Sequence, residues 1–151
     1  MHSLARRYLK TAIGFLVVGL AIGVWLLVRR ELGGAAISAR ELSAHTHALL
    51  VGFVMMMIAG VALWLFPRPS SDDARYNPRL AEAAWWCIAP GTALRVTAEV
   101  LAGFEPGPVL RGAIVVGGLA QAVGLGLVFW TLFPRIRAAG SAQREAKGER
   151  F

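Results

Sequence analysis

Two histidines open a long apolar run in the sequence HTHALLVGFVMMMIAG, residues 45–60. Imidazole nitrogens bind metals and carry protons near neutral pH, so His45 and His47 are the first candidates for chemistry. On one helix they lie about 200° apart and face different directions. His45 shares its face with Gly52 and Met56, a small and adaptable stripe that suits a close neighbour or a flat ligand, so we expect His45 to point into a helix bundle and these two residues to line a cofactor. His47 shares its face with branched aliphatic residues, and we expect it to point to lipid, to a partner subunit or along the membrane interface.

A second polar pair interrupts another apolar run. Arg95 and Glu99 lie four residues apart in GTALRVTAEVLAG, so on a helix they share one face and can neutralise each other. Either residue alone inside a bilayer would cost roughly 2.5–3.5 kcal/mol on insertion scales. Two interpretations follow. The pair is satisfied within itself near the outer interface, or Arg95 also binds an anionic ligand such as a propionate, which suits a guanidinium.

The surroundings of the histidines leave several chemistries open. Hydrogen bonding at the interface is the simplest. Zinc needs three or four protein ligands, and only Glu41 lies near the two histidines. Copper could combine histidine with the methionines of residues 55–57, but these begin about two turns deeper and point in different directions. Haem needs one histidine for each axial position, apolar surroundings and a cation for its propionates.

The composition indicates the elements that must position these residues. The chain has 151 residues, of which 56% are hydrophobic and 17% charged, and its mean hydropathy is +0.56. Four apolar blocks approach the roughly 20 residues that a helix needs to cross a bilayer. The sequence therefore predicts an all-α fold, an integral-membrane four-helix bundle in one domain. We place the domain at residues 1–137, its spans at 10–29, 44–66, 79–102 and 108–133, and a polar cytoplasmic tail at 138–151.

Charge predicts the orientation of the chain. The formal net charge is +7, but the basic residues lie at the ends of the apolar blocks, which is typical of membrane topology and not of nucleic-acid binding. Their excess on one side predicts that both termini are cytoplasmic in a multi-pass protein of the cell's inner membrane. That side carries Arg6, Arg7, Lys10, Arg68, Arg75, Arg79, Arg135, Arg137, Arg144, Lys147 and Arg150, and the other carries Arg29, Arg30, Arg40 and Arg111.

Two segments resemble a known family. The stretch AHTHALLVGFVMMMIAGVALWLFPR resembles the second transmembrane helix of the catalytic subunit of haem–copper oxidases, and is most similar to C-type oxidases, nitric oxide reductases and related short stand-alone proteins. In that family the helix begins with a histidine on the outer side, passes through a glycine and ends in a proline. Here these positions match His45 or His47, Gly60 and Pro67. The stretch RLAEAAWWCIAPGTALR resembles the third helix of the short proteins.

The resemblance implies a haem ligand. In the family the helix-two histidine is an axial ligand of a low-spin haem, which implies a b-type haem on His45 or His47, since no CxxCH is present for covalent attachment. The catalytic subunits use further histidines for a second metal centre, and this chain has only His2 besides the pair. We therefore expect that it is not an autonomous terminal oxidase.

The implied function has two forms. The first is a small membrane haem b protein linked to respiration or denitrification, which binds or senses a diatomic gas such as nitric oxide or carries electrons. Its sixth iron position would be empty, or filled by a methionine or by a histidine of another copy. Glycine-rich helices favour a homo-oligomer. The alternative is a haem-free assembly or accessory subunit of a respiratory oxidase or nitric oxide reductase.

Overall fold

The fold is built from long helices. The computed structural model describes residues 3–66, 77–136 and 147–148, and no strand occurs among them. The second helical rod in the chain is continuous but has three parts, because a π-helical segment separates two α-helices. The elements are α1 (Ser3–Glu31), α2 (Ala39–His47), η1 (Ala48–Met55), α3 (Met56–Leu65), α4 (Pro78–Phe104), α5 (Pro108–Leu132) and the short 3₁₀ turn η2 (Phe133–Arg135).

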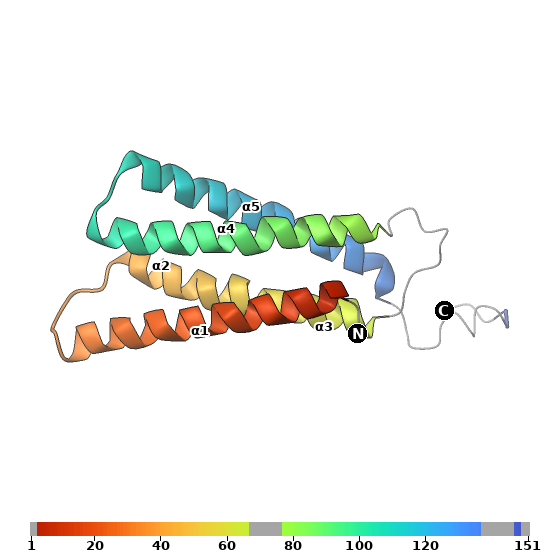
Figure 1. Cartoon of the computed structure of the whole chain (residues 1–151), viewed down its shortest axis with the longest axis horizontal. Coiled ribbons are helices and arrows are strands. Elements are labelled where there is room, and N and C mark those ends of the chain that lie inside the picture. Colours follow the sequence, from red (N-terminus) through yellow and green to blue (C-terminus); the bar gives the residue numbers. More distant parts are fainter. Residues whose placement is uncertain (1–2, 67–76, 137–146, 149–151) are drawn as a thin grey trace.

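The helices form two antiparallel hairpins that lie side by side (Figure 1). The connections after α1 and after α4 lie at one end of the molecule, here called the hairpin end. The start of α1, the end of α3, the start of α4 and the end of α5 lie at the other, here called the terminal end. The rod α2–η1–α3 packs against α1 along most of its length, α2 packs against α4, and α5 packs mainly against α4.

Local sequence sets where the helices begin. The Ser38 side chain accepts a hydrogen bond from the Glu41 backbone N–H, and the Glu41 side chain accepts one from the Ser38 N–H, which together form a capping box. This cap starts the rod at residue 39, earlier than the predicted 44. Asn77 caps α4, and Pro78 and Pro108 open α4 and α5 at the first helical position, where proline is favoured. The predicted tail, residues 138–151, lies outside the described residues except for 147–148.

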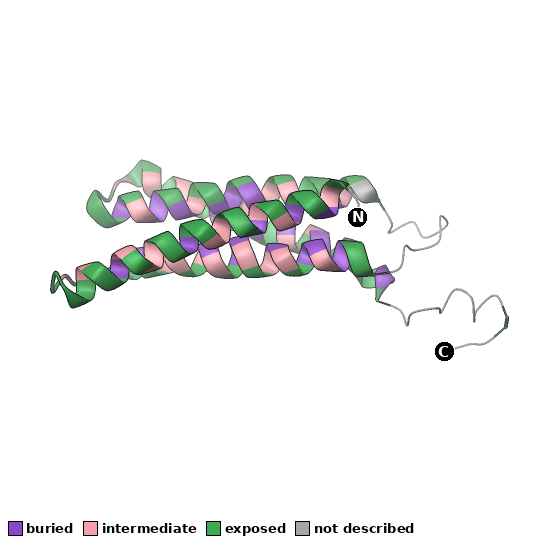
Figure 2. Cartoon of the chain, turned by 60° about the horizontal axis from the view of Figure 1, so that its bottom comes forward, coloured by how far each residue is buried: buried purple, intermediate pink, exposed green. Residues whose placement is uncertain are grey.

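Three of the four predicted spans are long and apolar enough to cross a membrane. They are α1, the rod Ala39–Leu65 and the segment Pro108–Arg135. The helix α4 is long enough but falls short in apolarity, because polar side chains including Arg95 and Glu99 interrupt it. Exposed residues run along the outer faces of the bundle (Figure 2), and many are large aliphatics such as Val17 and Leu119. Such surfaces suit contact with lipid.

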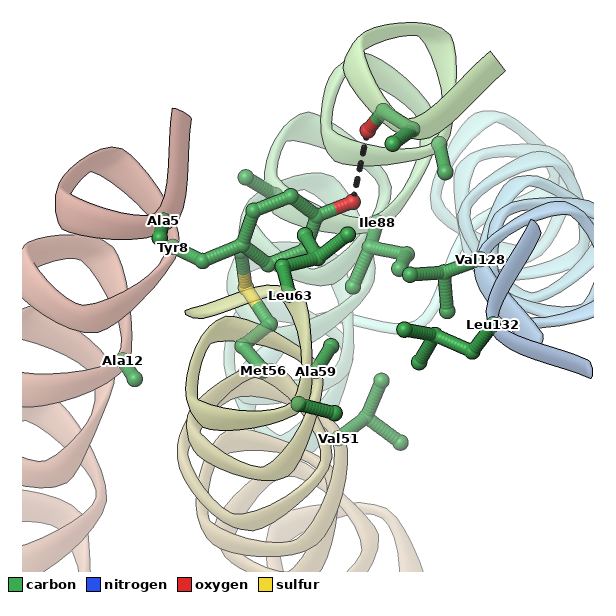
Figure 3. Close-up of a cluster of buried hydrophobic side chains, with 14 residues drawn as sticks. Ala5, Tyr8, Ala12, Val51, Met56, Ala59, Leu63, Ile88, Val128 and Leu132 are labelled. Atoms are coloured by element: carbon green, nitrogen blue, oxygen red, sulfur yellow. Dashed lines mark hydrogen bonds between the residues drawn. The ribbon is translucent and has the colours of Figure 1, made fainter. Parts of the chain in front are cut away.

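The core lies towards the terminal end, where all four rods meet. Figure 3 shows Tyr8 of α1 beside Met56 of α3, with Ile88 of α4 and Val128 of α5 nearby. These four side chains are fully buried, and the Tyr8 hydroxyl donates to the Ala81 carbonyl at 2.9 Å. Much of the remaining core is alanine, so the helix backbones approach closely. Since helices in lipid gain no hydrophobic free energy from association, dispersion contacts between these close backbones stabilise the bundle.

Glycine brings α4 and α5 together. A Cβ added at Gly117 would lie 2.7 Å from the Gly91 carbonyl oxygen, and one added at Gly124 would lie 2.5 Å from the Ile88 side chain. No larger residue fits at these contacts without a shift of the helices. The close approach also brings α5 within reach of the polar residues of α4.

Candidate functional site

His45 faces α1, and the predicted orientation into the bundle is confirmed. Its Nδ1 lies 2.9 Å from the Gly19 carbonyl oxygen. Its ring lies against Gly23, where an added Cβ would be 2.7 Å from the imidazole Cε1. The glycine in α1 therefore makes room for the imidazole, and the Gly19 carbonyl fixes its rotation.

His47 faces α4, in contrast to the predicted direction towards lipid, a partner or the interface. Its Nδ1 lies 2.8 Å from the Ser43 carbonyl oxygen and 4.0 Å from Oε2 of Glu99, and its side chain is 24% exposed. The predicted direction of His47 depended on this helix having a single buried face. In the structure α2 packs against α1 on one side and α4 on the other, so both histidines face protein.

Arg95 and Glu99 form the predicted ion pair and belong to a larger network. The Arg95 Nε donates to Glu99 Oε1 at 3.0 Å, and the Ser43 hydroxyl donates to the same oxygen at 2.8 Å. The Arg95 Nη1 donates to Gln121 Oε1 at 3.2 Å, and Gln121 in turn donates to the Thr92 hydroxyl at 3.0 Å. Glu99 is 3% exposed, and its Oε2 has no hydrogen-bond partner among the described residues.

Three members of this network were not predicted from the sequence: Ser43, Thr92 and Gln121. The signal that could have found Gln121 is its position as the one amide side chain inside the fourth apolar block. Such a group needs a partner in a bilayer, and the nearest available charges belong to the pair on α4. Glu41, considered earlier as a zinc ligand, is instead buried in an ion pair with Arg29.

The hydrogen bonds of the two histidines determine which nitrogen is available. Because each Nδ1 lies against a carbonyl oxygen, each carries the ring proton in the neutral form, and the lone pair is on Nε2. Within the described part of the chain, neither Nε2 forms a hydrogen bond. An Nδ1–H held by a backbone carbonyl with a free Nε2 is the usual arrangement of a metal-ligating histidine. The donor chemistry therefore fits an axial ligand.

Among the described residues, neighbouring side chains fill the space on the His45 face. Room for a flat ligand was expected beside the small residues of the His45 face, but Phe15 of α1 lies against Gly52, and Met56 is fully buried beside Tyr8. Two hollows of about 280 and 360 Å³ lie among the described residues, and neither is lined by His45 or His47. The small residues serve helix packing instead. No group of three or more His, Cys, Asp or Glu side chains could hold a metal ion in the described part, so zinc gains no support.

Comparison with known proteins identifies the family. The family model described as Cytochrome C and Quinol oxidase polypeptide I matches residues 3–144. The chain belongs to this family. The match extends the resemblance seen in the second and third apolar blocks over all four helical rods. No curated protein and no solved structure was found to match the chain. Membership of the polypeptide I family and the three apolar helices together make it an oxidase-related membrane protein.

Proposed function

We propose that this member of the polypeptide I family is a small haem b protein linked to respiration or denitrification, with His45 as an axial ligand. It binds or senses a diatomic gas such as nitric oxide, or it carries electrons. The observation that carries the proposal is the His45 geometry: Nδ1 held by the Gly19 carbonyl, the ring seated on Gly23 and Nε2 free of hydrogen bonds within the described residues.

The chain's own residues have distinct parts in this proposal. The Gly19 carbonyl keeps the His45 imidazole in one tautomer and one orientation, which raises its basicity as a ligand. Arg95 has its Nε and Nη1 engaged by Glu99 and Gln121, which leaves Nη2 for a propionate. A bound haem would supply the iron that takes a gas or an electron. Because neighbouring side chains fill the His45 face within the described residues, we expect lipid or a second copy of the chain to cover part of the macrocycle.

A second candidate is a haem-free assembly or accessory subunit of an oxidase or nitric oxide reductase. The observation that favours it is the filled space around the His45 face, where Gly52 lies under Phe15. In that case His45 and His47 serve as interhelical hydrogen-bonding groups. The exposed aliphatic faces of α1 and α5 would then contact a larger membrane subunit.

An absorption spectrum of the detergent-purified protein separates the two candidates. We expect a Soret band that survives extensive washing, and a haem content that approaches one per chain or one per oligomer interface. Protein from haem-replete cells that stays colourless, and that takes up no haem on titration, would reject the haem proposal and favour the accessory subunit.

We also propose that α4 is a fourth span and that both termini are cytoplasmic in the inner membrane. The charges of α4 support the span because Arg95 and Glu99 neutralise each other inside the bundle. The basic residues at the terminal end support the orientation. A cytoplasmic reporter fused after Phe151 is expected to be active and a periplasmic reporter inactive. The reverse pattern would place the histidines on the cytoplasmic side.

A further inference from the structure

A polar hollow at the terminal end, here called the terminal pocket, lies between the first two turns of α1 and of α4. It has a volume of about 280 Å³ and is lined by Ser3, Leu4 and Arg7 of α1 and by Arg79 and Glu82 of α4. Both helices begin at this end of the bundle (Figure 1), so the terminal pocket lies where they leave the apolar core. Charged side chains line this pocket, whereas apolar side chains line the hollow at the hairpin end.

Arg7 is held in place on one wall of the terminal pocket. Its Nη1 donates to Glu82 Oε1 at 3.0 Å, which joins α1 to α4. Its guanidinium carbon lies 5.2 Å from the centre of the Trp85 ring, in a cation–π contact. The other guanidinium N–H groups of Arg7 make no hydrogen bond among the described residues, so they are available to an anion.

The charges of the terminal pocket do not cancel. Two arginines and one glutamate line it, which leaves an excess of one positive charge. Glu82 pairs with Arg7. Arg79 lies three residues before Glu82 on the same face of α4, but in the described part of the chain no acidic side chain pairs with its guanidinium. The pocket therefore combines an uncompensated guanidinium with a second guanidinium that is fixed in position and with the Ser3 hydroxyl.

We infer that the terminal pocket binds a phosphate group, with Arg79 as its main cation and Arg7 and Ser3 as further donors. Guanidinium groups form charge-assisted hydrogen bonds to phosphate oxygens, often in pairs. Two sources share this chemistry: the headgroup of an anionic phospholipid and a soluble phosphate. The exposed Trp64 and Trp130 lie near the same end, as is typical of the level of lipid headgroups. The inference does not depend on haem, since neither histidine lines the pocket.

The test measures binding to the full chain in detergent micelles by tryptophan fluorescence, because Arg7 lies over the Trp85 ring. The probes are inorganic phosphate alone, and phosphatidylglycerol or phosphatidylcholine in mixed micelles. We expect an anionic probe to change the emission, and phosphatidylcholine to have a smaller effect because its choline opposes Arg79. The change should be absent in Trp85→Phe. A response to phosphatidylglycerol that inorganic phosphate neither causes nor competes with identifies the lipid headgroup, and a response to inorganic phosphate without lipid identifies a soluble phosphate.

Substitutions on the two walls test the residues. Arg79→Gln is expected to weaken binding about tenfold, as for the loss of one hydrogen bond to a charged group. Arg6→Gln is the matched control, because Arg6 is an exposed arginine at the same end but does not line the pocket. Ser3→Glu places a carboxylate on the α1 wall and is expected to abolish binding. Ser3 is exposed, so this change leaves the core intact.

Three results would overturn the inference. One is the absence of a response to both anionic probes. Another is an equal loss of binding in Arg79→Gln and Arg6→Gln, which would show general attraction to a basic end of the molecule. The third is unchanged binding in Ser3→Glu. Circular dichroism of each variant confirms that it is folded, so that loss of binding is not loss of structure.

Discussion

His45→Ala is expected to abolish bound haem, whereas His47→Ala is expected to keep it with an altered potential or altered gas access. In the proposed site the His45 Nε2 would hold the haem iron, so this variant would lack the axial ligand. His47 is held instead by Ser43 and lies 4.0 Å from Glu99 Oε2, so its removal changes the surroundings of the ligand. Loss of a group that surrounds a metal ligand typically lowers metal affinity by about 10–100-fold. A preparation that is saturated with haem should therefore keep its haem. The measurement is the Soret absorbance per chain after purification.

The controls for this pair separate ligation from folding. His45→Gly leaves the space above Gly23 open, so added imidazole should restore the Soret band if the histidine is a ligand. A colourless His47→Ala beside a normal His45→Ala would reverse the assignment. Normal spectra in both single variants would show that neither histidine binds haem.

Arg95→Leu is expected to destabilise the protein by about 3–5 kcal/mol, because it leaves the buried carboxylate of Glu99 without its cation. Gln121 also loses its donor from Arg95. The double variant Arg95→Leu with Glu99→Gln should recover much of this loss, since no uncompensated charge stays in the bundle. Unfolding in mixed micelles measures both effects, and Arg111→Gln, which removes an exposed arginine, is the control.

Two outcomes would contradict this role of the Arg95–Glu99 pair in stability. A single Arg95→Leu variant as stable as the wild type would mean that lipid or water satisfies Glu99. A double variant as unstable as the single one would assign the loss to packing and not to charge. The same variants test the propionate role: full haem and an unchanged spectrum in the double variant would show that Arg95 does not contact the cofactor.

The helices could be predicted because apolar length and proline positions are local properties. Pro78 and Pro108 open α4 and α5 close to the starts of the predicted spans 79–102 and 108–133. The start of α2 was missed because it depends on the reciprocal bonds between Ser38 and Glu41, which apolar periodicity does not report. The span 79–102, which corresponds to α4, was predicted from the length of its apolar block. Its hydropathy is nevertheless lowered by polar residues such as Arg95, whose hydrogen bonds come from neighbouring side chains.

The candidate site could be predicted in part. The spacing of Arg95 and Glu99 was sufficient to predict their ion pair, because that contact lies within one helix. Two features depend on which helices pack on each side of the rod: the direction of the His47 side chain, and whether the space beside Gly52 is filled. A single helix does not contain that information. Small residues indicate close approach, but whether a cofactor or a neighbouring side chain such as Phe15 fills the space is decided by the tertiary structure.

The π-helical segment Ala48–Met55 shifts the angular positions of the α3 side chains relative to those of α2. A π segment holds its backbone with i→i+5 hydrogen bonds, so it accommodates one residue more than an α-helix of the same path. Loss of one residue from this segment would restore α-helical bonding along the same path and leave both halves of the rod where they are. Loss of a residue from the regular helix α3 would instead turn the residues beyond it by about 100° relative to the histidines. The segment η1 is therefore the place where this rod tolerates a change in chain length while His45 stays against α1.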